Sequence, residues 1–109
     1  MDDALQRRVA ANEAMLRDVN EAIERGLWPG ERDTPTAFRC ECARMECNQM
    51  IELTGFEYER VRNHPRRFAL LPGHEIAEIE PVLERHAGYI VVEKQGAAGE
   101  SAEASDPRT

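Results

Sequence analysis

The sequence predicts an α+β protein of one small domain, since its 109 residues leave room for little more. Three observations indicate this class. Apolar residues recur at helical spacing over residues 3–27, residues 38–42 alternate as a strand does, and residues 54–57 form a helix-capping box. We therefore expect a long N-terminal helix followed by a small domain that contains a β-hairpin, two short helices and two further strands.

The first element is an amphipathic helix within residues 1–28. Gly26 and Pro29 end it, and residues 29–37, rich in proline and threonine, predict a linker. Three of its apolar positions recur every seven residues, so the helix could cover its own domain or pair with a second copy as a homodimer. The apolar positions are Leu5, Val9, Leu16, Val19, Ile23 and Leu27.

The core is expected over residues 38–94. A strand at 38–42 pairs as a hairpin with a strand at 50–53, through the loop between them. Thr54 then caps a helix that ends before Pro65.

The second half of the core continues with a strand at 67–71. Ile79, Val82 and Leu83 suggest a short helix that Gly88 ends, and residues 89–92 form the last strand. The aromatic residues expected in the core are Phe56, Tyr58, Phe68 and Tyr89.

Residues 95–109 contain no large apolar side chain, which predicts a disordered tail. The net charge of −7 argues against a protein that coats nucleic acid or anionic membrane. The apolar runs are too short to span a bilayer, and the acidic, polar N-terminus does not resemble a signal peptide. A cytoplasmic protein is the expectation.

The strongest chemical signal is the cluster of Cys40, Cys42 and Cys47, the only cysteines of the chain. An odd number of cysteines in a reducing compartment disfavours disulfides. Three thiolates are soft donors that suit zinc, and a core this small needs a metal or another cross-link. The spacing is unusual, because alternate residues of a flat strand lie about 7 Å apart, so the strand must bend. Buried free cysteines or a redox thiol pair are the alternatives.

The preferred fourth ligand is His74, because Pro72 and Gly73 before it form a tight turn that can bring the imidazole to a metal. His64 and His86 are the alternatives, although both fit better as residues at the ends of predicted helices. Four protein ligands would close the coordination sphere, which is typical of a structural zinc site.

A Cys3His zinc site carries one net negative charge. Arg39 and Arg44 flank the cysteines and could offset it, but Glu41 and Glu46 flank them as well. The flanking charges therefore leave the balance open.

Residues 38–94 resemble a family of small, largely uncharacterised actinobacterial proteins. The resemblance rests on five motifs: Phe38-x-Cys40-x-Cys42-x4-Cys47, Tyr58-x3-Arg62, Pro65-x2-Phe68, Pro72-Gly73-His74 and Tyr89-x-Val91-Val92-Glu93-Lys94. The helix pairs Asn12-Glu13 and Val19-Asn20 are also similar. The resemblance implies a Cys3His zinc domain with Cys40, Cys42, Cys47 and His74 as ligands, and it implies no catalytic activity.

A basic segment follows the predicted middle helix. Arg60, Arg62, Arg66 and Arg67 could bind an acidic partner or nucleic acid, or they could complement the dipole at the end of the helix. The acidic chain and the lack of interleaved aromatic residues disfavour nucleic acid.

The function expected from these features is a non-enzymatic, zinc-stabilised regulatory module that binds another protein through its N-terminal helix or the basic segment. The alternatives are a thiol-based redox or metal sensor that releases zinc on oxidation, and nucleic-acid contact through residues 60–67. An enzyme would need an open metal position or an activated thiol, and no catalytic motif indicates either.

Overall fold

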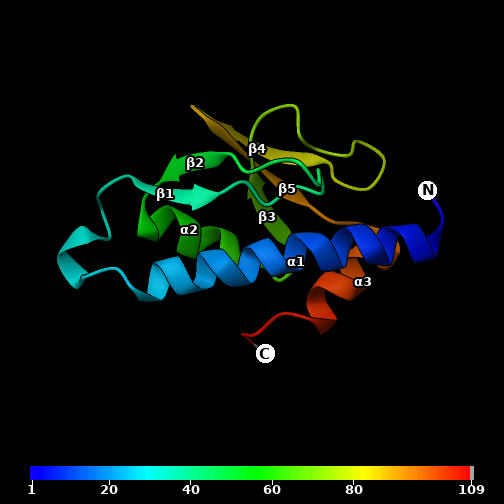
Figure 1. Ribbon diagram of the computed structural model, residues 1–109, viewed down its shortest axis with the longest axis horizontal. Coiled ribbons are helices and arrows are strands. Elements are labelled where there is room, and N and C mark those ends of the chain that lie inside the picture. Colours follow the sequence, from blue (N-terminus) through cyan, green and yellow to red (C-terminus); the bar gives the residue numbers. More distant parts are fainter. Residues whose placement is uncertain (109) are drawn as a thin grey trace.

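The computed structural model describes residues 1–108 and confirms a mixed α+β fold with a long N-terminal helix (Figure 1). Within those residues, no helix combines the length and the apolar character needed to cross a bilayer. The elements are α1 (Asp3–Arg25), the 3-10 turn η1 (Pro29–Glu31), β1 (Thr36–Arg39), β2 (Met50–Leu53), α2 (Gly55–Arg62), β3 (Arg67–Leu70), β4 (Val82–His86), β5 (Tyr89–Glu93) and α3 (Gly96–Ala104).

The strands form two small antiparallel sheets. β1 and β2 make the predicted hairpin, with Phe38 opposite Ile51. The second sheet has the order β3-β5-β4, so β5 is its central strand. Helix α1 runs along the length of the molecule and packs against both β1 and α3 (Figure 1).

Local sequence signals fix the helix ends. The Asp2 side chain accepts a hydrogen bond from Leu5 N and caps α1. At α2, Thr54 accepts from Glu57 N while the Glu57 carboxylate accepts from Thr54 N, which confirms the capping box. Both helices therefore begin where the sequence predicts.

The main core lies between the two sheets and α2. Tyr58, Phe68 and Tyr89 are buried there as predicted, and the Tyr58 ring stacks on Phe38. Phe56 was expected in the core but is 55% exposed, because it lies on the solvent side of the first turn of α2.

The predicted helix around residues 79–83 is wrong. Residues 82–86 form strand β4, which pairs with β5 across a two-residue turn that contains Gly88 at a φ of +90°. Pro81 has no N–H for a helix, and β5 offers an edge with free hydrogen-bonding groups. Gly88 therefore closes a hairpin rather than ending a helix.

The prediction of a disordered tail at residues 95–109 is also wrong for the residues described. Residues 96–104 form α3, and its buried alanines Ala97, Ala98 and Ala102 permit close packing beside α1. The sequence shows no hydrophobic pattern for this helix, because the apolar residues that it buries are alanines rather than large side chains.

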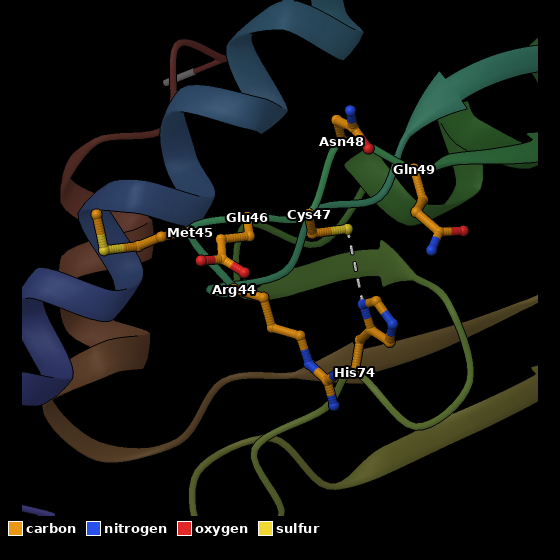
Figure 2. Close-up of a pocket in the computed structure, with 7 residues that line it drawn as sticks. All are labelled: Arg44, Met45, Glu46, Cys47, Asn48, Gln49 and His74. Carbon is orange, nitrogen blue, oxygen red and sulfur yellow. Dashed lines mark hydrogen bonds between the residues drawn. The ribbon is translucent and has the colours of Figure 1, made fainter.

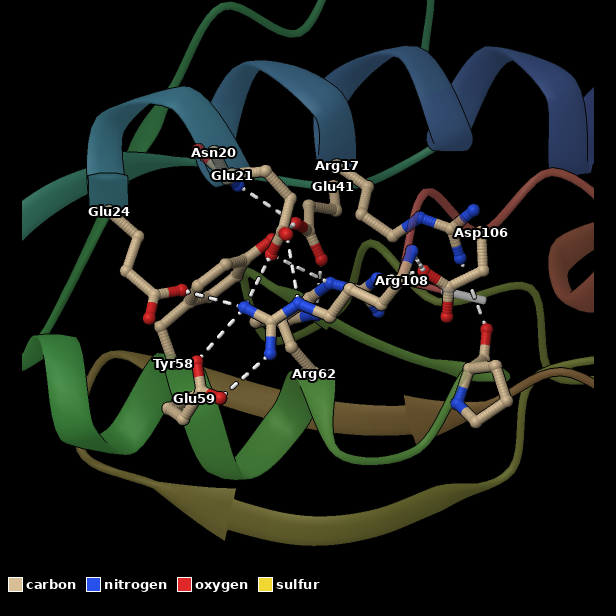
Figure 3. Close-up of polar contacts among 12 residues, drawn as sticks. Arg17, Asn20, Glu21, Glu24, Glu41, Tyr58, Glu59, Arg62, Asp106 and Arg108 are labelled. Atoms are coloured by element: carbon tan, nitrogen blue, oxygen red, sulfur yellow. Dashed lines mark hydrogen bonds and ion pairs between the residues drawn. The ribbon is translucent and has the colours of Figure 1, made fainter. Parts of the chain in front are cut away.

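Helix α1 buries a charged face that its apolar pattern does not predict (Figure 3). Leu5 and Val19, expected on the buried face, are exposed, whereas Arg17, Asn20 and Glu21 are buried. Each buried group has a partner: Arg17 donates to the carbonyls of Pro65 and Ala102, and Glu21 pairs with the buried Arg62 of α2. Polar contacts thus join α1 to the domain.

Candidate metal centre

Three cysteines and one histidine come together at the corner between the two sheets. Cys40, Cys42 and Cys47 lie in the loop between β1 and β2, and His74 follows β3. Figure 2 shows Cys47 and His74 facing each other. Their donor atoms all lie within 4.8 Å of one another, so the four residues could hold a metal ion. Within residues 1–108, this group contains the four metal ligands that the sequence predicts, and neither His64 nor His86 belongs to it.

The spacing of the donor atoms fits a tetrahedral ion. Nδ1 of His74 lies 3.7 Å from Sγ of Cys40 and 3.7 Å from Sγ of Cys47. A tetrahedral zinc with Zn–S bonds of about 2.3 Å and a Zn–N bond of about 2.0 Å separates sulfur from nitrogen by about 3.5 Å. The side chains therefore need to move little to bind such an ion.

The turn before His74 has the geometry that its sequence predicts. The His74 N–H donates to the Leu71 carbonyl across Pro72 and Gly73, and Gly73 has a φ of +88°. Proline at the second position and a positive φ at the third are typical of a type II turn. This turn directs the imidazole back toward the cysteine loop.

Backbone N–H groups lie near the sulfurs. Leu71 N donates to Sγ of Cys40 at 3.2 Å, and the N–H groups of Arg44 and Gln49 act to lower the pKa of Cys42 and of Cys47 respectively. Such contacts stabilise thiolates more than thiols. The backbone would therefore help to stabilise the thiolates of a bound metal.

The strand bends where the cysteines require it. β1 ends at Arg39, and Cys40, Glu41 and Cys42 are all buried, so they do not alternate as strand residues do. The Asn20 side chain of α1 bonds both the N–H and the carbonyl of Arg39 and thereby occupies the place of a neighbouring strand.

Glu41 anchors the bend from the inside. Its carboxylate accepts hydrogen bonds from the Tyr58 hydroxyl at 2.6 Å and from the Asn20 amide and Ala69 N–H at 2.9 Å each. Sequence reasoning missed this role, because a glutamate between two cysteines normally reads as exposed. Its position within a strand-like segment gave no signal of burial.

The thiols differ in acidity. Burial raises the pKa of Cys40 and of Cys42. Burial also acts to raise the pKa of Cys47, but the Gln49 N–H, the neighbouring sulfurs and Arg39 outweigh it and lower that pKa overall. Burial and the nearby Arg44 lower the pKa of His74, which favours the neutral imidazole that binds metals.

The two arginines that flank the cysteines, Arg39 and Arg44, both contact backbone carbonyls of the residues that form the cluster or of the turn beside it. Arg44 donates to the Gly73 carbonyl at 2.8 Å, and Arg39 lies near the Cys47 carbonyl at 3.5 Å. Neither forms a salt bridge with a carboxylate within residues 1–108, whereas Glu41 is turned into the core. The arginines are therefore free to balance a negatively charged metal centre.

The basic segment does not form the exposed patch that was considered. Arg62 is fully buried and pairs with Glu21 and Asp106. Arg66 pairs with Glu103, Arg67 with Glu93, and the exposed Arg60 lies near Glu84. Charge pairing within the chain thus removes Arg62 from the candidate partner-binding residues and partly neutralises the other three.

No protein-family model, curated protein or solved structure matches this chain. The resemblance to actinobacterial Cys3His proteins therefore stays a prediction. What the structure establishes is the cluster itself, four residues that could bind a metal ion.

Proposed function

We propose that the protein is a non-enzymatic, zinc-binding interaction module with a structural Cys3His site. The observation that carries the proposal is the convergence of Cys40, Cys42, Cys47 and His74 within 4.8 Å. Three sulfurs and one imidazole nitrogen form a donor set that favours zinc over harder cations.

A structural role is supported by the number of ligands and by their place in the fold. Four protein ligands leave zinc no position for water or substrate, so the site lacks what a catalytic zinc needs. Cys40 and Cys42 belong to the main core, and His74 lies on the turn after β3. Zinc would tie the β1–β2 loop to that turn.

The surface we propose for a partner is the exposed side of α1. Met15 is 67% exposed, and Leu5 and Val19 are exposed by two fifths or more, although they are apolar residues on a regular helix. The partner is either another protein or a second copy of this chain. Nucleic acid is disfavoured as the partner, because arginines of the basic segment are paired with carboxylates and the chain has a net charge of −7. Reduced thiolate ligands agree with a cytoplasmic location.

The first test is the metal content of the purified protein, measured by mass spectrometry before and after chelation, with circular dichroism on the same samples. We expect one zinc per chain and loss of native structure when zinc is removed. His74→Ala should lose the zinc, whereas the matched variants His64→Ala and His86→Ala should keep it. A folded, metal-free protein would overturn the proposal.

The partner surface is tested separately. Sedimentation velocity of the zinc-loaded protein over a range of concentrations shows whether it self-associates, and Met15→Ser with Val19→Ser should abolish any association. Arg25→Ser, at an exposed position of the same helix, is the control. A protein that stays monomeric at every concentration would direct the search to a different partner protein.

A further inference from the structure

The four candidate ligands are not equally protected from solvent. Cys40 and Cys42 are each 1% exposed, whereas Cys47 and His74 are partly exposed. An open depression of about 460 Å³ is lined by Cys47, His74 and the loop residues beside them (Figure 2). A small molecule from solvent therefore reaches the centre from the side of Cys47.

The chain allows Cys47 to move more easily than Cys40. Cys40 directly follows β1, its N–H donates to the Gln49 carbonyl, and its sulfur accepts from Leu71 N. Cys47 ends an irregular loop that projects into solvent, where Met45 is 94% exposed. Movement of this loop need not disturb the pairing of β1 with β2.

Cys42 is the thiol best placed to react with a modified Cys47. The two residues lie at opposite ends of the same loop, and their sulfurs lie within 4.8 Å. A disulfide needs its sulfurs about 2.05 Å apart, so the loop must contract by a few ångströms. Cys40 is as buried as Cys42, but it is held at both its backbone and its side chain: its N–H donates to the Gln49 carbonyl and its sulfur accepts from Leu71 N at 3.2 Å.

The charges around the depression suit an oxidant that releases an anion. Arg44 lines the depression and donates a hydrogen bond to the Gly73 carbonyl, and Arg39 lies 3.5 Å from the Cys47 carbonyl. Glu46 lines the depression as well, so the two arginines face one carboxylate there. Neither is paired with a carboxylate in the described part of the chain. Their guanidinium groups can stabilise hydroxide or alkoxide as it leaves.

We propose that Cys47 is an oxidation site for hydroperoxides, and that its oxidation leads to a Cys42–Cys47 disulfide and release of the metal. The inference rests on the proposed zinc site. The Cys47 sulfur attacks the outer peroxide oxygen and is oxidised by two electrons to sulfenic acid, while the O–O bond breaks and the reduced oxygen leaves as hydroxide or alkoxide and takes a proton from water. The Cys42 thiolate then attacks the sulfenic sulfur, forms the S–S bond and expels hydroxide, which is also protonated.

Loss of two thiolates leaves only Cys40 and His74 to hold the metal. Two ligands do not satisfy a tetrahedral zinc, so the ion leaves and the His74 turn is no longer tied to the cysteine loop. The expected result is a local loosening of this corner that a thiol reductant and zinc reverse.

The test treats the zinc-loaded protein with a few equivalents of hydrogen peroxide and follows released zinc with a colorimetric chelator. Digestion after Arg44 and after Glu41 separates the three cysteines onto different peptides, so mass spectrometry identifies the disulfide. We expect zinc release in step with a Cys42–Cys47 cross-link. In a parallel experiment without peroxide, N-ethylmaleimide should modify Cys47 more than about tenfold faster than Cys40 or Cys42.

The outcomes separate this inference from the proposed function. A protein without zinc at the start would contradict the metal site itself. A zinc-loaded protein that keeps its metal, forms a disulfide through Cys40, or reacts first at Cys40 or Cys42 would overturn only the oxidation proposal. Met45→Leu should release zinc as the wild type does, and slower release would instead assign the effect to oxidation of that exposed methionine.

Discussion

Two regions join distant segments of this chain by different means. At the metal corner, four side chains from one loop and one turn converge on a single point. Beneath α1, buried ion pairs and hydrogen bonds link α1 with α2, with α3 and with the residues after α3 (Figure 3). Metal binding adds directly to the free energy of folding, whereas a buried ion pair chiefly penalises the loss of either partner. Single substitutions should therefore have effects of different size in the two regions.

The largest effect is expected at the metal corner. Cys42→Ser removes a buried ligand, and zinc sites of this kind contribute about 10–16 kcal/mol to the folding of zinc-finger peptides. Since small domains are stable by only about 5–15 kcal/mol, the variant should be unfolded at 25 °C even with zinc present. Circular dichroism and thermal melts measure this.

The matched control is Met45→Ser in the same loop. Its side chain is 94% exposed, so its stability should stay within about 0.5 kcal/mol of the wild type. A Cys42→Ser protein that melts like this control would show that the cysteines are ordinary core residues.

A smaller effect is expected among the buried charged residues beneath α1, here called the ionic layer: Arg17, Glu21, Arg62 and Asp106. Arg62→Met leaves the buried carboxylate of Asp106 without its ion-pair partner and takes away one of the two arginines that pair with Glu21, the other being Arg108. Breaking a buried pair in this way costs about 3–5 kcal/mol. Urea unfolding of the zinc-loaded protein should show this loss without a change in metal content. In contrast, Arg60→Met, whose side chain is 68% exposed, should change stability by less than about 1 kcal/mol.

The same comparison explains what the sequence could predict. The candidate ligands were predictable because the chain has only three cysteines and they lie close together in the sequence. Pro72 and Gly73 likewise predict the turn that positions His74. Strands with β-branched residues and the capping box at Thr54 were local signals too. These features depend on neighbouring residues, which is why the sequence predicted them.

The ionic layer could not be predicted, because its partners are far apart in sequence. Arg62 meets Glu21 and Asp106, which lie 41 and 44 residues away along the chain. A charged residue on a helix normally faces solvent, so Arg17 and Glu21 gave no sign of burial. The assignment of residues 95–109 as a tail failed for the same reason, since the partner of α3 is α1, at the other end of the chain. The error at Gly88 was local, because a short apolar run before a glycine fits a helix end and a hairpin turn equally well, and pairing with β5 decides between them.

A third buried cluster, formed by Glu13, Glu80 and Lys94, should make the stability of the protein depend on pH. Glu13 and Glu80 share the single ammonium of Lys94, and all three side chains are fully buried. Burial, opposed by Lys94 and assisted by Glu80, raises the pKa of Glu13 well above its usual value. The folded protein thus holds a proton that the unfolded chain gives up, and stability falls as the pH rises from the unfolded pKa toward the folded one.

Glu13→Gln keeps the neutral form at every pH and should remove this dependence. Its stability relative to the wild type should increase with pH, by at most about 1.4 kcal/mol per pH unit within that window. Urea unfolding of both proteins between pH 5 and pH 8 measures the difference in their free energies of unfolding. Both proteins keep the same four candidate metal ligands, so the pH dependence of that site cancels in the difference. Glu78→Gln, at an exposed site on the loop before β4, is the control. A constant difference across the range would mean that Glu13 is ionised in the folded protein.

The smallest loss of stability is expected at the helix cap Thr54, which the sequence predicts from four consecutive residues. Thr54→Ala removes the hydroxyl that accepts from Glu57 N, and the loss of such a cap costs about 1 kcal/mol. Thr34→Ala, at an exposed position before β1, should change stability by less than about 0.5 kcal/mol. The cap is the feature most easily predicted from sequence, yet it should matter less than Arg62, whose role no local pattern indicates. If Thr54→Ala instead cost as much as Arg62→Met, the start of α2 would be as important to the fold as the ionic layer that α2 helps to form.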